Sequence, residues 1–437
     1  MITNVTDLQH GYPTPAHSPN EGEVTCWLLD TRDLWPGDNI STAKGAAEAL
    51  SLVSVQERNA IRGKMFVQDA RMSLASALLK RLFISRTLGI KWDEVRMARK
   101  GNEKHGKPCA VDNVGRPIAG IDFNVSHQGG LVALIGFNGR SSHEYTPSGM
   151  VYGMISPTTQ PEEVMCGVDI VCVNERDDYR TIDAEGFDGW VDIYDAVFSG
   201  EERWSMKYDV DYVTLYDGTI LNRDAIGRHD RCIARDKPLT ITTLSGQDYS
   251  FSSELILEAK LRRFYTYFCY KESYIKLAGE ALLAPWLKQL EFFNVRSPKP
   301  GMEARCSTHG RWGEEVEDVE VHMHGRPVSD VRMKIQAFEE NFMISTAIQG
   351  DIQGLKVPAF KSLNLQSDVL AFARPPAPPK REERVHKRMA SDPIMLTSPR
   401  RPTITDPLLH TLYTLKDMPT MNDNPYLYAR EVPLCLM

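Results

Sequence analysis

The sequence lacks the features of a secreted or membrane-spanning protein. It contains no apolar run of about eighteen residues, so we expect no transmembrane helix. The first residues, MITNVTDLQH, include neither a basic nor an apolar segment, so we expect no secretory signal and a cytoplasmic location. With 42% apolar and 25% charged residues, the composition is that of a globular protein.

Paired cysteines and an excess of basic charge are also missing. The eight cysteines are dispersed, none forms a CxxC pair, and most lie in apolar stretches. We therefore expect reduced thiols that pack as small apolar side chains, and no zinc site. The net charge of -7 gives no sign of a nucleic-acid partner.

Periodic segments predict both helices and strands. The 437 residues suffice for two or three domains. Apolar residues recur at helical spacing in 45–88 and in 254–282. Strands are predicted at 121–127 and 131–137, joined as a hairpin through glycines, and another at 164–173.

Other segments carry weaker or irregular patterns. Alternation in 315–325 suggests an exposed strand, whereas 138–162 is rich in Gly, Ser and Pro and predicts a linker. Residues 207–253 are polar and Asp-rich without clear periodicity, which suggests an insertion. Residues 375–402 are Pro-rich and basic, so we expect disorder.

An ionisable carboxylate interrupts one apolar strand. The stretch CGVDIVCV, residues 166–173, places Asp169 among Val, Ile and Cys. A buried and unpaired carboxylate costs several kcal/mol, so Asp169 needs a cation if the strand is buried. That cation could be a metal ion or an Arg or Lys side chain; alternatively, Asp169 lies at a solvated strand end.

A second carboxylate lies on the predicted helix 254–282. Phe264, Phe268, Glu272 and Lys276 are four residues apart and share one line on the helix surface. The two phenylalanines should face a core, which draws Glu272 towards buried space. Glu272 and Lys276 could be a plain surface ion pair, or Glu272 and Asp169 could share Mg²⁺, which prefers oxygen ligands.

The predicted hairpin offers groups suited to a phosphate. In FNVSHQGG, Ser126 and His127 end an apolar strand beside glycines that allow close approach of a ligand. Lys107, between Gly106 and Pro108, could add a positive charge. The alternative is a capped hairpin with a solvent-exposed histidine.

Together these segments resemble a known family. In order, HGKPC, FNVSHQGG, GVDIV and YKESYIKLAGEAL are similar to the hallmarks of 4′-phosphopantetheinyl transferases of the surfactin-synthetase type. The resemblance covers roughly residues 55–137, 163–205 and 254–285. The long inserts and the Pro-rich tail resemble those of the broad-range enzyme of filamentous fungi.

The resemblance implies a reaction and a catalytic set. Such an enzyme transfers the phosphopantetheine arm of coenzyme A (CoA) to a serine of an acyl, peptidyl or aryl carrier protein and releases adenosine 3′,5′-bisphosphate. Asp169 and Glu272 would hold Mg²⁺ on the pyrophosphate, and Glu272 would deprotonate the serine, directly or through water. Lys276 would bind the pyrophosphate and offset the charge of the leaving group. The carriers would belong to polyketide, non-ribosomal peptide and related pathways.

The resemblance also implies contacts with CoA. Lys107 would lie near the adenine and the ribose phosphate, while Ser126 and His127 would bind the 3′-phosphate. Further contacts would come from Ser73, Arg62 and Lys64.

Two positions depart from the family pattern. Many bacterial members carry a second strand carboxylate where this chain has Val171, which leaves two protein carboxylates for the metal. Phe268 replaces the tryptophan of the helix motif, which preserves bulk and removes an indole donor.

The implied fold is α+β, with two similar halves related by a pseudo-two-fold axis. Each half would pair a small antiparallel sheet with a long helix, and CoA would lie in the cleft between them. The expected divisions are 1–162, 163–372 with the insertion 207–253, a flexible segment 373–404 and an extension 405–437. We expect a monomer without nucleic-acid or membrane partners.

Two other functions fit parts of the pattern. A catalytically inactive protein that binds CoA or a nucleotide would not need the carboxylate pair. A Mg²⁺-dependent phosphohydrolase would use the carboxylates, but the GKP and NVSH segments indicate an extended, 3′-phosphorylated ligand.

Overall fold

A computed structural model describes eight segments of the chain. These are residues 22–101, 106–140, 163–173, 178–227, 235–280, 284–301, 309–350 and 354–374. All of them belong to one compact unit, residues 1–376. Most of the predicted linker 138–162, the segment 375–402 and the extension 405–437 lie outside the described residues.

The first sheet contains the predicted hairpin. Its strand order is β17-β1-β5-β4, with β1 and β5 antiparallel, β5 and β4 antiparallel, and β17 parallel to β1. The strands are β1 (Glu23–Asp30), β4 (Ile121–Gln128), β5 (Leu131–Asn138) and β17 (Lys361–Ser362). Gly129 and Gly130 have φ values of 58° and 85°, the left-handed backbone that a two-residue hairpin turn requires.

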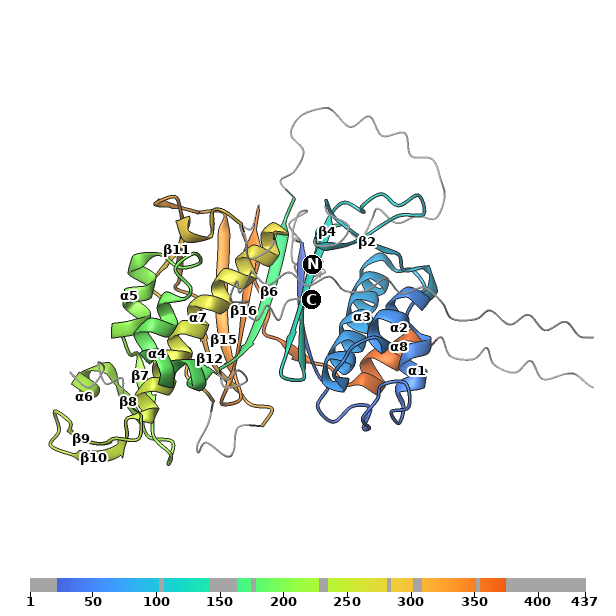
Figure 1. Ribbon diagram of the computed structural model, residues 1–437. Helices are drawn as coiled ribbons and strands as arrows, with labels where there is room; N and C mark the ends of the chain where they lie inside the picture. Colours follow the sequence, from blue (N-terminus) through green and yellow to red (C-terminus); the bar gives the residue numbers. More distant parts are fainter. Residues whose placement is uncertain are drawn as a thin grey trace, which may run out of the picture. The chain divides into compact units, whose positions relative to one another are not determined.

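Helices cover one face of this sheet, as Figure 1 shows. They are α1 (Ala46–Ser51), α2 (Val55–Arg62) and α3 (Val67–Leu88), which confirms the helices predicted in 45–88. Helix α3 can approach the sheet closely because Gly136 has no side chain: an added Cβ would lie 2.2 Å from the Phe83 ring. The π-helix η5 (Leu365–Leu370) and α8 (Ala371–Ala373) return to this core from late in the chain.

The second sheet has the order β12-β15-β16-β6 and is antiparallel throughout. Its strands are β6 (Met165–Cys172), β12 (Trp312–Val316), β15 (Val331–Phe338) and β16 (Phe342–Gln349). Helix α7 (Glu254–Ala278) packs against β6 and β16. It confirms the predicted helix but ends earlier, at Gly279, whose φ of 73° terminates it.

Gly167 lets α7 lie directly on β6. A Cβ at this position would lie 2.1 Å from the carbonyl oxygen of Ser273, which is on the helix. The neighbouring positions alternate, as strand geometry requires. Val168 and Ile170 contribute to the core between the two sheets, whereas Val171 packs on the side of α7. Asp169 shares that helix-facing side with Gly167.

The single strand predicted at 315–325 is wrong. Strand β12 ends at Val316, and the chain resumes as β13 (Glu320–Met323) in another sheet, β11-β13-β14. Val316 and Val321 are both buried, although residues five apart in one strand would face opposite sides. The chain therefore changes sheets within the alternating pattern. The partners of β13 are β11 (Leu290–Phe293) and β14 (Arg326–Pro327).

The segment 207–253 has secondary structure of its own. Two small hairpins and a short helix pack around a core that includes Val213, Leu221 and Phe251. Its elements are β7 (Tyr212–Thr214), β8 (Ile220–Asn222), α6 (Arg223–Ile226), β9 (Pro238–Thr242) and β10 (Asp248–Ser252). The remaining elements are η1 (Trp92–Glu94), β2 (Met97–Arg99), β3 (Pro108–Ala110), α4 (Asp178–Asp192), α5 (Gly200–Tyr208) and η3 (Leu287–Gln289).

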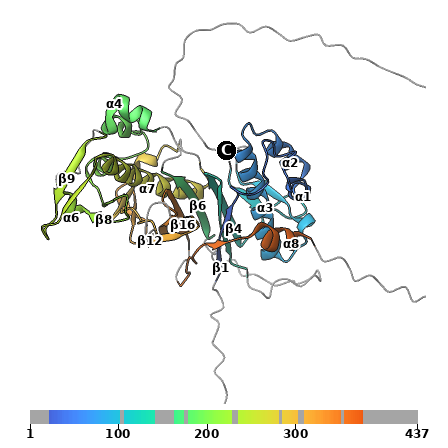
Figure 2. The ribbon, with the colours of Figure 1, turned by 90° about the horizontal axis from the view of Figure 1, so that it is seen from below.

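The two four-stranded sheets meet through a shared apolar core. Cys26 and Leu131 of the first sheet pack with Cys166 and Ile344 of the second. Figure 2 shows β4 beside β6 at this junction. The cysteines of the described residues are free thiols, as expected, and burial raises the pKa of Cys26 to about 12.

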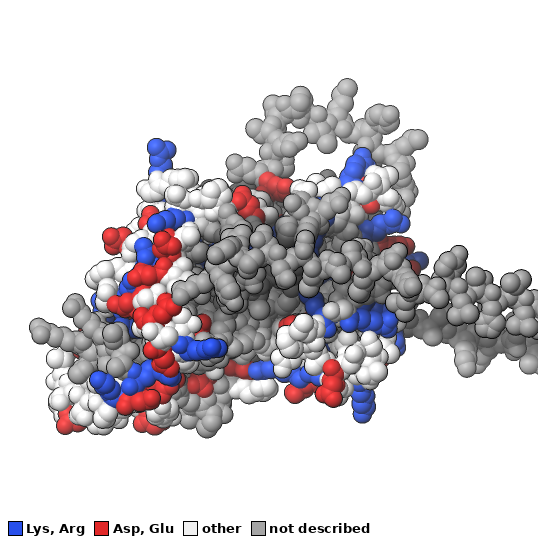
Figure 3. Space-filling view, viewed as in Figure 1, with Lys and Arg blue, Asp and Glu red and all other residues white. Residues whose placement is uncertain are grey.

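Within the described residues, no helix is both long and apolar enough to cross a membrane. On the face shown in Figure 3, basic and acidic side chains are interspersed over the described surface. This mixture agrees with the small net charge of -7 for 437 residues.

Candidate active site

Polar side chains of β4 accept hydrogen bonds from backbone N–H groups at the outer edge of β6. Strand β6 ends its sheet, so part of its backbone has no strand partner. The Cys166 N–H donates to Asp122 Oδ2 at 2.8 Å, and the Val168 N–H donates to Asn124 Oδ1 at 3.1 Å. We call Asp122, Asn124 and Ser126 the polar ladder of β4. All three are buried, and they fix where β6 lies against the first sheet.

The last member of the polar ladder reaches the carboxylate of Asp169. The Ser126 hydroxyl donates to Asp169 Oδ1 at 2.9 Å. The Lys276 ammonium donates to the same oxygen at 2.5 Å and to the Ser126 hydroxyl at 2.8 Å. Three elements, β4, β6 and α7, therefore meet at one carboxylate oxygen. Asp169 is 4% exposed, which excludes the solvated strand end, and its partner in this structure is a lysine.

Glu272 lies one helical turn before Lys276 and is also buried. It is 2% exposed, so the plain surface pair is wrong. Phe264 and Phe268, on the same line of the helix, are buried as predicted. Burial by itself would lower the pKa of Lys276, but the negative charges of Asp169 and Glu272 outweigh it and raise that pKa. The lysine therefore stays charged at neutral pH.

The donor set at this site suits a hard divalent cation. Asp169 and Glu272 are both buried, and both act electrostatically on Lys276 and on the Cys269 thiol, whose pKa burial raises. Two buried carboxylates near one another need positive charge, and Mg²⁺ takes oxygen ligands. The residues present thus fit a Mg²⁺ site with two protein carboxylates. Val171, on the same side of β6, packs in the apolar core and supplies no third ligand.

His127 lies among positive charges at the end of β4. Burial, followed by the charges of Lys276, Lys80 and Lys64, lowers its pKa to about 4. The imidazole is therefore neutral at pH 7, and a group of ammonium ions faces it. Such a group favours a phosphate. Lys64, predicted as a CoA contact, thus acts electrostatically on His127, and so does Lys80 on α3, which the sequence did not single out.

The other residues predicted to contact CoA differ in their surroundings. Lys107 is 7% exposed, and its ammonium donates to the Asp122 carboxylate and to the Cys166 carbonyl. Ser73 lies half-buried on α3, one residue after Met72, whose sulfur accepts from the Gly130 N–H at the hairpin turn. Arg62 is exposed at the end of α2, and no contact within the described residues ties it to His127.

Lys271 in the helix motif has a structural role that the sequence analysis missed. Its side chain is fully buried and pairs with Glu202 at 3.0 Å. It also donates to the carbonyls of Leu287 and Leu290. Burial lowers the pKa of Lys271 and raises that of Glu202. The sequence signal that could have indicated a structural role for Glu202 is the capping box that it forms with Ser199 at the start of α5.

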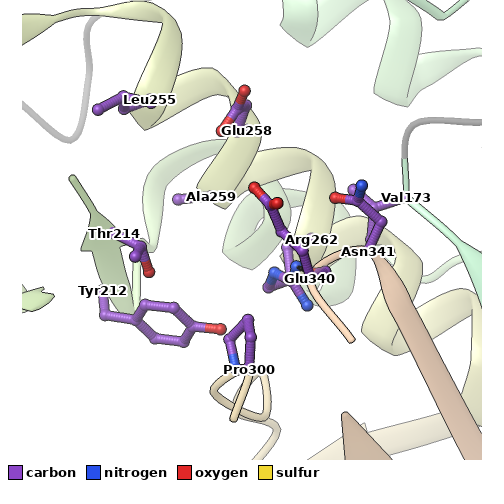
Figure 4. A pocket seen from close by; sticks show the side chains of 10 residues that line it. All are labelled: Val173, Tyr212, Thr214, Leu255, Glu258, Ala259, Arg262, Pro300, Glu340 and Asn341. Carbon is purple, nitrogen blue, oxygen red and sulfur yellow. Dashed lines mark hydrogen bonds between the residues drawn. The ribbon is translucent and has the colours of Figure 1, made fainter. Parts of the chain in front are cut away.

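Two other places in the described residues have features of a binding site. Asp30, His309 and Glu339 lie close enough to hold a metal, but Arg32 already donates to both carboxylates. A cavity of about 30 Å³ beside Tyr212 and Arg262 has room for about one water molecule. Figure 4 shows Arg262 and Glu258 projecting from α7 towards it. Arg262 precedes Glu272 by ten positions, or about 15 Å along the helix, so this cavity is separate from Asp169 and Lys276.

Comparisons with known proteins identify the class of enzyme to which this chain belongs. A family model described as "4′-phosphopantetheinyl transferase, N-terminal" matches residues 41–138. The chain is 60% identical over 350 residues to a 4′-phosphopantetheinyl transferase of Aureobasidium melanogenum, which covers 80% of this chain and 97% of that protein. It is 34% identical over 340 residues to 4′-phosphopantetheinyl transferase A of Aspergillus fumigatus (75% and 83% covered).

A third relative is the 4′-phosphopantetheinyl transferase NpgA of Emericella nidulans, 30% identical over 340 residues (75% and 82% covered). A shorter match of 109 residues, 35% identical, is to the L-aminoadipate-semialdehyde dehydrogenase-phosphopantetheinyl transferase of Schizosaccharomyces pombe (25% and 39% covered). The chain belongs to the 4′-phosphopantetheinyl transferase family and is a transferase enzyme of that class.

Proposed function

We propose that this enzyme transfers the 4′-phosphopantetheine arm of CoA to a serine of apo carrier proteins and releases adenosine 3′,5′-bisphosphate. The observation that carries this proposal is the meeting of Asp169, Ser126 and Lys276, with Glu272 one turn away. The family resemblance assigns Asp169, Glu272 and Lys276 to the pyrophosphate end of CoA and Ser126 to its 3′-phosphate.

In this proposal Asp169 and Glu272 hold Mg²⁺, which supplies charge neutralisation at the pyrophosphate. The Lys276 ammonium binds pyrophosphate oxygens and offsets the charge that grows on the leaving group. Glu272 accepts the proton of the carrier serine, directly or through water. The apolar packing of Phe264 and Phe268 on the same helix line keeps Glu272 in a buried setting.

The 3′-phosphate of CoA would lie against His127. Its imidazole is neutral in the free protein because burial, followed by the charges of Lys276, Lys80 and Lys64, lowers its pKa to about 4. A dianionic phosphate would neutralise those charges and allow the imidazole to take up a proton and donate to the phosphate. Ser73, which follows Met72 on α3, would add a hydroxyl contact.

CoA would run along the junction between the two four-stranded sheets, the cleft of a pseudo-two-fold arrangement. This orientation takes the 3′-phosphate to β4 and the pyrophosphate to β6 and α7. Lys107 would then act through Asp122 and β6, or contact the adenosine only after leaving Asp122. We further propose a monomer in the cytoplasm, without nucleic-acid or membrane partners.

The substrates would be carrier domains of polyketide synthases and non-ribosomal peptide synthetases. The name of the Schizosaccharomyces pombe relative suggests an aminoadipate-semialdehyde dehydrogenase as a further type of carrier-bearing substrate. An inactive CoA-binding protein or a phosphohydrolase would give no reason for the buried carboxylates together with the cationic site at His127.

The direct test is a mass measurement. The protein is incubated with CoA, Mg²⁺ and several apo carrier domains, and each carrier is then weighed. We expect each accepted carrier to gain one phosphopantetheine arm, and none to do so when Mg²⁺ is chelated. No gain on any carrier of these classes would refute the proposal.

A further inference from the structure

The Lys276 ammonium is hydrogen-bonded to a carboxylate oxygen that the proposed metal could bind. Its ammonium lies 2.5 Å from Asp169 Oδ1, and the Ser126 hydroxyl donates to that same oxygen. Asp169 is 4% exposed and the ammonium is held between it and Ser126. A divalent cation approaching Oδ1 would therefore meet a fixed positive charge at hydrogen-bond distance.

Two cations repel each other strongly at such a distance when water is largely excluded. Metal binding through Oδ1 of Asp169 requires the Lys276 ammonium to leave that oxygen and find other acceptors. Ser126 offers only one neutral hydroxyl, and the Glu272 carboxylate, which also acts on Lys276, is itself a proposed metal ligand. A pyrophosphate arriving between β6 and α7 would provide several anionic oxygens within reach of the same side chain.

We propose that Lys276 keeps Asp169 closed to metal in the free enzyme and releases it when a pyrophosphate binds, so that metal and CoA bind cooperatively. This inference rests on the proposed function. It gives Lys276 a role in binding, before the reaction starts, in addition to its contact with the leaving group. The lysine makes the binding of metal together with CoA more favourable than the binding of metal alone.

The arrangement also explains how an apolar strand tolerates a carboxylate without ligands. An unpaired buried carboxylate is destabilising, and Lys276 supplies the missing charge until substrate arrives. Glu272 contributes to the same balance because it, too, acts on the charge of Lys276. Coupling between two ligands through one shared side chain is typically five- to 150-fold, at about 1–3 kcal/mol.

The test measures metal binding without turnover. Mn²⁺ serves as the probe because it accepts oxygen ligands and its free concentration can be measured by electron paramagnetic resonance. The wild-type protein is titrated with and without CoA, beside Lys276→Met and Lys276→Gln. Lys276→Gln keeps a hydrogen-bond donor for Ser126, so it serves if the Met variant does not fold. Lys44→Met, which removes an exposed lysine, controls for the change in net charge.

Without CoA, we expect either Lys276 variant to bind Mn²⁺ about tenfold or more tightly than wild type, and Lys44→Met to match wild type. CoA should tighten Mn²⁺ binding more in wild type than in the Lys276 variants. Lys276 variants that fold, shown by circular dichroism, and bind Mn²⁺ alone no more tightly than wild type would overturn the inference.

The carrier assay separates the two proposals. If the wild-type enzyme loads carriers but the folded Lys276 variants bind Mn²⁺ no more tightly than wild type, the proposed function stands and the proposed role of Lys276 in metal binding is wrong. A wild-type protein that loads no carrier and binds no Mn²⁺ even with CoA would overturn both.

Discussion

At the scale of single residues, the structure shows what each motif position does before substrate binds. Lys271 and Glu272 are adjacent in the sequence, yet Lys271 pairs with Glu202 in the core while Glu272 belongs to the site. Within the hairpin segment, Asn124 satisfies the edge of β6 and Ser126 reaches Asp169. Motif residues of one family can therefore serve the scaffold or the chemistry side by side.

His127 should determine whether the enzyme distinguishes CoA from dephospho-CoA. Replacing it by alanine removes one charged hydrogen bond to the 3′-phosphate, which is worth about 1.5–3 kcal/mol, or about 10- to 100-fold in affinity. Binding of dephospho-CoA should change little. Calorimetric titrations of both ligands measure this, with wild type as reference. A variant that prefers CoA as strongly as wild type would refute the 3′-phosphate assignment.

His127 should also make the free enzyme sensitive to mild acid. Its pKa is about 4 in the folded state against an ordinary value of 6.5, so between these pH values the unfolded chain binds more protons than the folded one. The contribution of His127 to stability therefore falls as the pH falls from 6.5 towards 4. Urea unfolding of wild type and His127→Gln at pH 7.5 and pH 5 tests this. The variant should lose less stability over that interval, and an equal loss would contradict the prediction.

At the scale of elements, the contact between α7 and β6 sets the geometry of the site. Helix and strand approach so closely that the Ser273 carbonyl would lie 2.1 Å from a Cβ on Gly167. Glu272 and Lys276 flank Ser273 on the helix, and Asp169 is two residues from Gly167 on the strand. Any change in this spacing moves the carboxylates relative to each other.

Gly167→Ala should therefore impair both stability and activity. The backbone carbonyl cannot swing away as a side chain could, so α7 must shift; overpacking of this kind costs typically about 1–3 kcal/mol. Urea unfolding and carrier loading measure the two effects. Gly200→Ala, where an added Cβ meets nothing within 4 Å, is the matched control and should behave like wild type. A Gly167→Ala enzyme with unchanged stability and rate would show that the contact is looser than this geometry requires.

The sequence predicted most elements but not the contacts between them. Helical spacing identified α3 and α7, and the paired glycines identified the hairpin, because both signals are local. The change of sheet after Val316 was missed because alternation continues through the break. The role of Asp122 could not be predicted, since it depends on which strand edge faces β4.

Part of the site was predictable for the same reason. Asp169 was conspicuous because a carboxylate in an apolar strand needs a partner, and Glu272 because its helix line is apolar. Lys80 could not be predicted as a site residue, since a lysine on a helix is ordinarily solvated. Only the packing of α3 against the first sheet lets its charge act on His127. That Lys276 is the partner of Asp169 could not be predicted from the sequence, because the fold brings α7 and β6 together.

At the scale of the whole molecule, the two four-stranded sheets are joined at more than one place. Besides the shared apolar core and the polar ladder of β4, Arg32 at the end of β1 bridges Asp30 and Glu339. Its guanidinium lies 2.6 Å from Asp30 and 2.7 Å from Glu339, which is on the turn between β15 and β16. The two sheets are therefore fixed relative to each other by polar contacts as well as by packing.

Glu339→Gln should weaken this junction. Burial alone would raise the pKa of Glu339, but hydrogen bonds from Arg32 and Gly310 outweigh it and lower that pKa. A lowered carboxyl pKa stabilises the fold above the ordinary value of 4.5, and that stabilisation is lost as the pH falls through the folded-state pKa. We expect a loss of about 1–2 kcal/mol at pH 7, which shrinks towards pH 4.

Urea unfolding at both pH values measures this difference. Glu23→Gln, on the exposed start of β1, controls for the lost charge. A difference between Glu339→Gln and wild type that stays constant with pH would contradict the assignment to the Arg32 contacts.

The proposed role of Asp169 and Glu272 as the metal ligands for phosphopantetheine transfer can be tested with one rate measurement. The initial rate of carrier loading is followed by mass spectrometry for wild type, Asp169→Asn and Glu272→Gln at saturating CoA and Mg²⁺. Both substitutions keep side-chain size. We expect wild type to add the arm to the carrier and each variant to be slower by about a hundredfold or more. Loading at the wild-type rate by either folded variant would contradict it.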